Sequence, residues 1–181
     1  SLAGIIAEGT KAERDHYGEL LVRFLFSGPV RTGMLHADPH PGNFRVLPRP
    51  DGGPGGLGVL DFGAVARLPD RQLPTAMGTL IRIASLQDKH ELLDGLRREG
   101  FVKENITVDP DLLLEYLAPF IEPTRGERFQ FTREWMREQF QRLNDPSEPT
   151  FAMATKLNLP PGYLLIHRTW LGTIGLLCQL E

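Results

Sequence analysis

Cysteine is nearly absent from this sequence. A single cysteine, Cys178, occurs in 181 residues, so no disulfide can form within the chain. Structural disulfides belong to oxidising compartments, whereas proteins in reducing compartments rely on packing alone. We therefore expect a cytoplasmic protein whose stability comes from a hydrophobic core, and the length fits one ordinary domain.

Neither sign of charge dominates the composition. The 23 acidic and 20 basic residues give a formal net charge of −3. Nucleic-acid binding depends on clustered Lys and Arg side chains that neutralise phosphates. We therefore expect no nucleic-acid partner.

Uninterrupted apolar runs are short. The most apolar long segment, YLLIHRTWLGTIGLLCQLE, contains His167 and Arg168. A membrane-spanning helix needs about 20 consecutive apolar residues. We expect a buried or docking helix here, and at most peripheral contact with a membrane.

Helical patterns dominate the rest of the chain. Apolar residues recur at helical spacing over residues 2–27, which predicts one or two helices, and Gly28 and Pro29 predict the end of this helical stretch. The runs FRVL and LGVLDF, separated by PRPDGGPGG, predict a β-hairpin. Further helices are expected at 70–87, 88–99, 109–121, 131–143 and 161–180, with Leu112, Leu113, Trp135, Phe140, Trp170 and Leu171 in the core.

The predicted fold is mainly α with one small β-hairpin. We divide it into leading helices (1–30), a segment with the polar motifs and the hairpin (31–68), and a helical subdomain (69–181).

Two polar motifs flank the predicted hairpin. HADPHPGN has the form H-x-D-x-x-x-x-N and is followed, beyond the hairpin, by DFG. In this order they form the paired signature of the protein-kinase catalytic lobe. Mg²⁺ prefers carboxylate, amide and phosphate oxygens. The pattern therefore predicts Asn43 and Asp61 as Mg²⁺ ligands, and Asp38 as the group that orients or deprotonates the acceptor hydroxyl.

The neighbouring residues complete the predicted site. His40 stands two residues after Asp38, where ordinary protein kinases carry a lysine that faces the transferred phosphate, so we assign it a catalytic contact. His36 is expected to organise the loop through a hydrogen bond to the backbone, and Gly63 to let the chain turn sharply after Asp61. The expected nucleotide-binding and cofactor-binding residues are His36, Asn43, Asp61, Phe62 and Gly63.

Two other interpretations of the first motif stay open. His36, Asp38 and His40 alternate as transition-metal ligands on a strand would, although Pro39 and Pro41 argue against a regular strand. Alternatively, the polar residues serve only to cap turns and end a strand.

The motifs HADPHPGNF and VLDFGAVARL resemble those of the UbiB-like atypical kinases, the aarF-domain or ubiquinone-biosynthesis kinase-like family. The ending LPPGYLLIHRTWLGTIGLLCQL is similar to the family's late Pro-Pro, Leu-His-Arg helix, so the resemblance extends from Tyr17 to Leu180. It implies the C-terminal lobe of a protein-kinase-like fold, with Asp38 as the catalytic-loop aspartate and Asn43 and Asp61 as Mg²⁺ ligands.

The resemblance also implies ATP and Mg²⁺ as cofactors. The implied activity is ATP hydrolysis or phosphotransfer to a small-molecule or lipid-linked acceptor, such as a quinone or isoprenoid precursor. The short AVARLPDRQ after DFG, without an A-P-E segment, fits this better than protein phosphorylation.

The family's nucleotide lobe has no counterpart in this sequence. That lobe precedes the catalytic loop and carries a K-x-G-Q motif, an alanine-rich loop and a Lys–Glu pair, whereas 35 residues precede His36 here. Lys11 and Glu13 are expected to be solvated surface charges. We therefore expect a fragment, or a C-lobe that depends on a separate N-lobe or partner chain.

Two alternative functions are retained. Aminoglycoside and choline phosphotransferases carry a similar H-G-D-x-H-P-x-N loop, but Ala37 and the sequence DFGA favour the UbiB-like family. A non-catalytic kinase-like binding module is the other alternative, so enzyme activity itself is left open.

Overall fold

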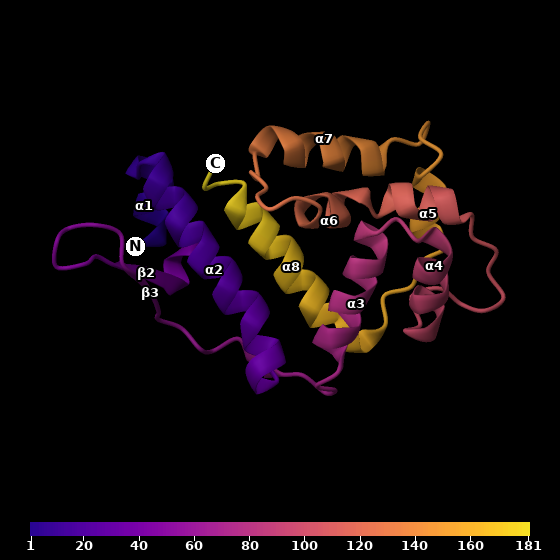
Figure 1. Ribbon diagram of the computed structural model, residues 1–181, viewed down its shortest axis with the longest axis horizontal. Helices are drawn as coiled ribbons and strands as arrows, with labels where there is room; N and C mark the ends of the chain where they lie inside the picture. Colours follow the sequence, from indigo (N-terminus) through magenta and orange to yellow (C-terminus); the bar gives the residue numbers. More distant parts are fainter. The chain divides into compact units, whose positions relative to one another are not determined.

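The computed structural model describes residues 1–181 and is mainly helical, with two small antiparallel sheets (Figure 1). The helices are Leu2–Glu8 (α1), Lys11–Thr32 (α2), Leu73–Ser85 (α3), Lys89–Arg98 (α4), Pro110–Tyr116 (α5), Ala118–Ile121 (α6), Arg133–Asn144 (α7) and Leu164–Leu177 (α8). The strands are Met34–His36 (β1), Phe44–Leu47 (β2), Gly56–Val59 (β3) and Val65–Arg67 (β4).

The chain divides into two compact units, which are described separately. The first comprises Ser1–Gln72, Phe131–Arg133 and Leu165–Glu181, and it contains both polar motifs. The second comprises Leu73–Gln130 and Glu134–Leu164.

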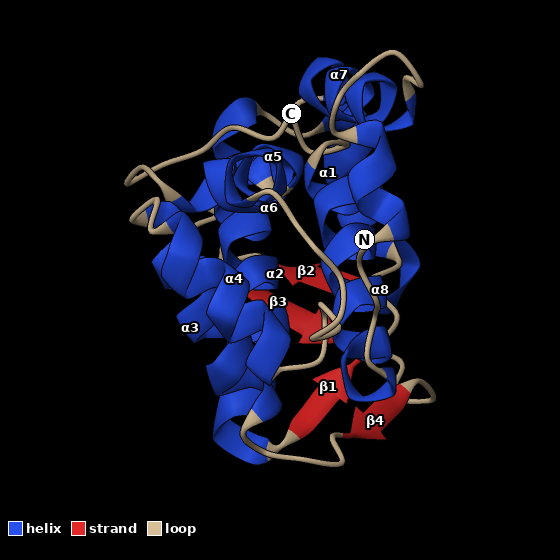
Figure 2. Cartoon of the chain, turned by 90° about the vertical axis from the view of Figure 1, so that its right-hand side faces the viewer, coloured by secondary structure: helices blue, strands red, loops and turns tan.

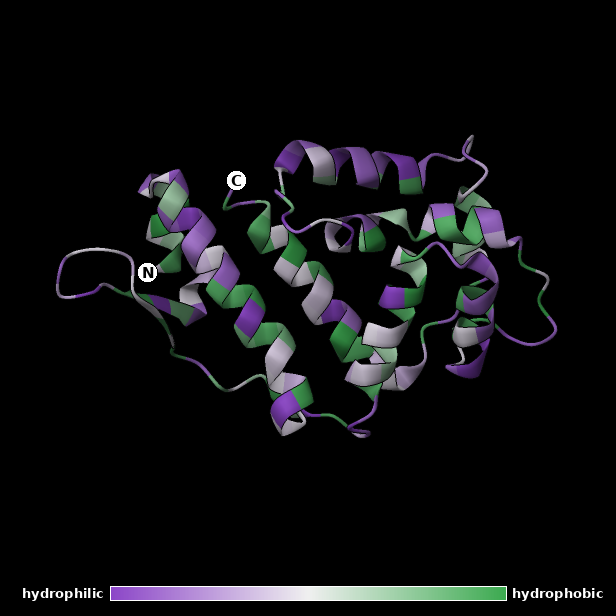
Figure 3. Ribbon diagram, in the orientation of Figure 1, coloured by the Kyte–Doolittle hydropathy of each residue, from purple (hydrophilic) through white to green (hydrophobic).

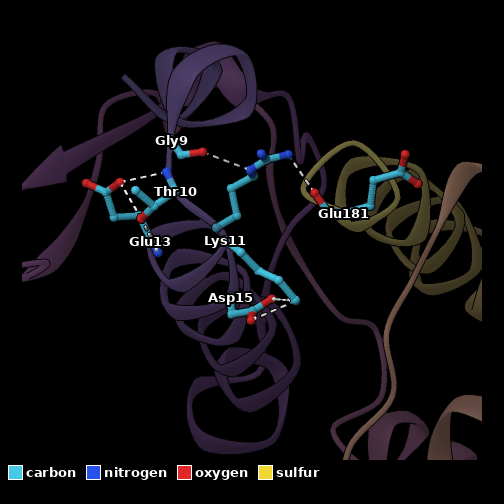
Figure 4. A network of polar contacts seen from close by, with 7 residues as sticks. Gly9, Thr10, Lys11, Glu13, Asp15 and Glu181 are labelled. Atoms are coloured by element: carbon cyan, nitrogen blue, oxygen red, sulfur yellow. Dashed lines mark hydrogen bonds and ion pairs between the residues drawn. The ribbon is translucent and has the colours of Figure 1, made fainter.

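A capping box starts α2 (Figure 4). The Glu13 backbone N–H donates to the Thr10 hydroxyl oxygen at 3.3 Å, and the Thr10 backbone N–H donates to the Glu13 carboxylate at 2.8 Å. The Thr10 hydroxyl also donates to the Glu13 carboxylate at 2.8 Å, and the two hydrogen bonds that this carboxylate accepts from the Thr10 backbone N–H and hydroxyl lower the pKa of Glu13. Lys11 pairs with Asp15 at 2.9 Å on the exposed surface. The expectation that Lys11 and Glu13 are surface charges is confirmed.

The predicted end of this helix at Gly28 and Pro29 is wrong, because α2 continues to Thr32. Pro29 cannot donate to the Leu25 carbonyl and its ring crowds that carbonyl, yet it lies buried inside the helix. The helix ends at Gly33, whose φ of 71° is the left-handed conformation that glycine adopts without a Cβ clash. As a result, α2 leads directly into β1.

The predicted hairpin is confirmed, and a second sheet accompanies it (Figure 2). Strands β2 and β3 pair antiparallel, with Phe44 opposite Val59. Strands β1 and β4 also pair antiparallel, with His36 opposite Val65, a pairing that the sequence did not predict. The hairpin is therefore enclosed within a second, shorter strand pair.

The core of the first unit joins α1, α2, β2 and α8, and α8 lies alongside α2 (Figure 1). Its buried residues are Leu2, Tyr17, Leu21, Leu25, Phe44, Leu176, Leu177 and Leu180. Trp170 on α8 packs against Phe26 on α2, with ring centroids 4.9 Å apart. Leu171, expected in the core, is 47% exposed because it lies on the opposite face of α8 from the buried Thr169 and Thr173. None of the helices combines the length and apolar character that a membrane crossing requires.

The second unit contains α3 to α7. The predicted helix over 109–121 is divided into α5 and α6, because Pro119 has no N–H to donate to the Glu115 carbonyl. Leu113 is fully buried, as expected. Phe140, also expected in the core, is 67% exposed on α7, which has no buried residue and is mostly hydrophilic in Figure 3.

Candidate functional site

The two strand pairs bring the polar motifs together. The first motif begins at His36, the last residue of β1, and continues through the loop to β2, and the DFG sequence occupies the loop between β3 and β4. Each ladder is extended by a backbone hydrogen bond of 2.9 Å, from Leu60 N to Asn43 O and from Ala37 N to Ala64 O. The two loops therefore run beside each other, held at both ends.

Asp38 and Asn43 are bound to each other. The amide nitrogen of Asn43 donates to Asp38 Oδ2 at 2.8 Å and to the Asp38 backbone oxygen at 3.2 Å. We name this pair of bonds the Asp38–Asn43 latch. Because the latch uses the amide nitrogen, the amide oxygen of Asn43 is left for another partner, and it is an atom type that Mg²⁺ prefers.

Asp61 lies exposed in a tight turn. Its Oδ1 accepts a hydrogen bond from Gly63 N at 2.7 Å, which leaves Oδ2 outside the turn. A Cβ at Gly63 would lie 3.1 Å from Asp61 Oδ1. Gly63 does not adopt a positive φ, so the turn does not require glycine for its backbone conformation, and the constraint on a larger residue is this close approach alone.

His36 holds the backbone of the Asp61 turn through a hydrogen bond. It is 6% exposed, and its Nε2 lies 2.7 Å from the backbone oxygen of Asp61. Because that oxygen can only accept, Nε2 carries the proton, and the buried Nδ1 is an acceptor without a partner. The rings of Phe24, Phe44 and Phe62 lie around the imidazole, at centroid distances of 5.7, 5.8 and 6.3 Å. The expected hydrogen bond from His36 to the backbone is present.

His40 and Phe62 lie on the surface of the site. His40 Nδ1 accepts from Gly42 N at 3.1 Å and caps the 3₁₀ turn Pro41–Asn43. The hydrogen bond that His40 makes is therefore within its own loop and uses Nδ1, not Nε2. Phe62 is 64% exposed even though its ring contacts that of His36.

The alternative transition-metal site is not assembled. His36 Nε2 is held by Asp61 O, and His40 Nδ1 is held by Gly42 N. The structure gathers no group of three or more His, Cys, Asp or Glu side chains that could hold a metal. The oxygen donors Asn43 and Asp61 fit Mg²⁺ chemically, but two side chains fill only part of an octahedral shell.

Sequence reasoning missed the supports beneath the motifs. Phe24 on α2 and Phe44 on β2 meet at His36 with an inter-ring distance of 6.2 Å, although they are distant in sequence. The apolar spacing of α2 marks Phe24 only as a helical residue, and no local pattern links it to the loop. The β1–β4 pairing was likewise invisible because each strand has three residues.

Comparisons with known proteins agree with the motifs. Residues 6–93 match the family model of the ABC1 atypical kinase-like domain. The Arabidopsis thaliana protein ACTIVITY OF BC1 COMPLEX KINASE 3, chloroplastic, is 26% identical over 140 residues, covering 77% of this chain and 18% of that protein. A solved structure of Mycobacterium tuberculosis Rv3197 in complex with erythromycin has a TM-score of 0.80 and 32% identity, and it covers 99% of this chain. This chain spans 43% of that relative.

Proposed function

Because this chain belongs, through residues 6–93, to the ABC1 atypical kinase-like family, we propose that it provides the catalytic-loop and metal-binding part of an atypical kinase or ATPase. In this proposal it is the helical C-terminal lobe of a kinase-like fold. The observation that carries the proposal is the Asp38–Asn43 latch, held beside the Asp61 turn by the two extended ladders.

In this proposal the Asp38 carboxylate and the Asn43 amide oxygen have different roles. Asp38 orients or deprotonates the acceptor hydroxyl, and the bond from Asn43 fixes its carboxylate. The Asn43 amide oxygen and the free Asp61 oxygen hold Mg²⁺, which neutralises phosphate charge when it is bound. One asparagine thereby links the position of the base to the position of the metal.

The small number of protein ligands implies that metal and nucleotide bind together. Mg²⁺ in kinase sites is held by one or two carboxylates and by substrate phosphates. Asn43 and Asp61 leave most of the coordination shell to phosphate and water oxygens. We therefore propose ATP with Mg²⁺ as the ligand, with His40 Nε2 directed to the transferred phosphate and Phe62 beside the nucleotide.

The acceptor and the partners are proposed from family resemblance. They are a small-molecule or lipid-linked acceptor, such as a quinone or isoprenoid precursor, and a nucleotide lobe that lies elsewhere in the polypeptide or in a partner chain. Peripheral contact with a membrane would bring a lipid acceptor to the site.

Non-catalytic ligand binding is the second candidate function. The similar structure of Rv3197 is described as a complex with erythromycin, and it matches almost all of this chain. Erythromycin is therefore a rational second ligand to titrate. Saturable macrolide binding without Mg²⁺-dependent ATP binding would favour this candidate.

The test is calorimetric titration of the chain with ATP, with and without Mg²⁺. Asp61→Asn keeps an Oδ1 that accepts the Gly63 N–H, so its free energy of unfolding should stay within about 0.5 kcal/mol of wild type. It removes a charged metal ligand, so we expect Mg²⁺-dependent ATP affinity to fall by about 100-fold.

A matched control is Asp70→Asn. Asp70 is also exposed, and its Oδ1 accepts a backbone N–H, from Gln72, at 2.7 Å. This variant should bind ATP with Mg²⁺ as wild type does. Equal binding by the Asp61 and Asp70 variants, or binding by wild type that does not depend on Mg²⁺, would refute the proposed site.

A further inference from the structure

Helix α8 touches the catalytic loop at Gly172. A Cβ at this position would lie 2.8 Å from Cγ and 3.6 Å from Cδ of Pro39, the residue that follows Asp38. Carbon atoms in ordinary contact are about 3.5–4.0 Å apart. We propose that Gly172 is a positioning residue, whose missing side chain lets Pro39 rest on α8 and thereby sets the Asp38–Asn43 latch. The inference rests on the proposed function for its catalytic meaning.

The helix cannot readily move away from the loop. Leu176 and Leu177 of α8 lie in the core with α1 and α2, and Trp170 packs against Phe26 of α2. Thr169 and Thr173 are also buried, and the Thr173 hydroxyl donates to the Thr169 carbonyl at 2.7 Å. Withdrawal of α8 would open this core, so an added methyl group at 172 would displace the loop instead.

Displacement of Pro39 acts directly on the latch. The proline ring includes the backbone nitrogen, so its Cγ cannot swing aside as the end of a flexible side chain can. Restoring ordinary contact requires a movement of about 0.7 Å, and it is transmitted through the peptide bond to the Asp38 carbonyl. That carbonyl accepts the longer bond of the latch, 3.2 Å from Asn43 Nδ2. This bond is therefore the first that Gly172→Ala should break.

The first measurement is the nuclear magnetic resonance spectrum of the ¹⁵N-labelled chain. Gly172→Ala should shift the Asn43 side-chain amide and the Gly42 backbone amide. The matched control is Gly175→Ala on the same helix, where a Cβ meets no atom within 4 Å. The control should leave both signals in place and raise the melting temperature by about 2–4 °C, because alanine favours a helix over glycine.

A double-mutant cycle identifies the contact responsible. Pro39→Ala removes the ring atoms that a Cβ at position 172 would meet. In that background, Gly172→Ala should no longer shift the Asn43 amide further. An unchanged Asn43 amide in the Gly172→Ala single variant would overturn the inference, as would an equal shift in both backgrounds.

Binding of ATP with Mg²⁺ separates this inference from the proposed function. If both hold, Gly172→Ala lowers the affinity about 10-fold, and Gly175→Ala does not. If wild type binds no ATP while the Pro39-dependent shift is present, the proposed function fails and the positioning role of Gly172 stands. If wild type binds ATP and the shift is absent, the positioning role fails alone.

Discussion

Replacing His36 by phenylalanine should separate stability from nucleotide binding. His36 is 6% exposed, with one ring nitrogen bonded to the Asp61 carbonyl and the other buried without a partner. Phenylalanine keeps an aromatic ring among Phe24, Phe44 and Phe62, and it removes both nitrogens. Removing Nε2 therefore destabilises the protein, because a hydrogen bond is lost, whereas removing the unpartnered Nδ1 stabilises it.

The expected change in the free energy of unfolding follows from three terms. Loss of the bond from Nε2 to Asp61 O costs about 1 kcal/mol, and removal of the unsatisfied Nδ1 returns about 1–3 kcal/mol. Fitting the larger ring into this space costs about 1 kcal/mol. The sum lies within about 1 kcal/mol of wild type. His36→Ala, by contrast, leaves a cavity and should cost about 3 kcal/mol.

Binding should respond differently from stability. Without the bond to Nε2, the Asp61 carbonyl loses the side chain that positions it between the two ladder bonds, so we expect the affinity for ATP with Mg²⁺ to fall about 10-fold. Urea unfolding and calorimetric titration measure the two quantities. His16→Phe is the matched control, because His16 Nε2 also lies 2.7 Å from a backbone oxygen, that of Gly55 at the hairpin loop. Equal loss of affinity in the His36 and His16 variants would refute this reasoning.

Two further predictions concern the frame around the site. Gly33→Ala should lower the free energy of unfolding by about 1–2 kcal/mol, because its φ of 71° strains any residue with a Cβ. Gly78→Ala, where a Cβ meets no atom within 4 Å, should not lower it, and equal stability of the two variants in urea would contradict this backbone strain. Burial raises the pKa of the Cys178 thiol to about 11, so a thiol-specific reagent at pH 8 should leave the native protein unmodified and react once urea unfolds it. Rapid labelling of the native protein would show that Cys178 is accessible.

Local chemistry explains which parts of the fold were predictable. The hairpin was predicted because glycine, proline and aspartate mark its turn between two strand-like runs. The β1–β4 pair was missed because His36 and Val65 meet only after the chain has traversed the entire hairpin. The end of α2 was misplaced because the helix continues past Pro29, which is buried inside it, even though a proline there cannot donate to the Leu25 carbonyl and crowds it.

Sequence alone also identified the polar residues of the candidate site but not what holds them. Asp38, Asn43 and Asp61 were selected by motif and spacing, and the structure places them on adjacent loops. The unsatisfied nitrogen of His36 and the contact between Gly172 and Pro39 depend on tertiary geometry, for which spacing carries no signal. The exposure of Phe140 was not predicted, because helical periodicity identifies the apolar side of a helix but not which residues of that side other elements bury.

The site depends on the two helices beneath it. A pair of strands is at best marginally stable by itself in water, so neither small sheet can hold the loops without support. The α2 helix supplies Gly33 at the entry to β1 and Phe24 beside His36, and α8 supplies Gly172 beneath Pro39. Because a shared core joins α2 to α8, the support of Asp61 and that of Asp38 are mechanically connected. The positions of the two loops are thus set by helix packing, and substitutions within that packing should alter the site without changing any of its polar residues.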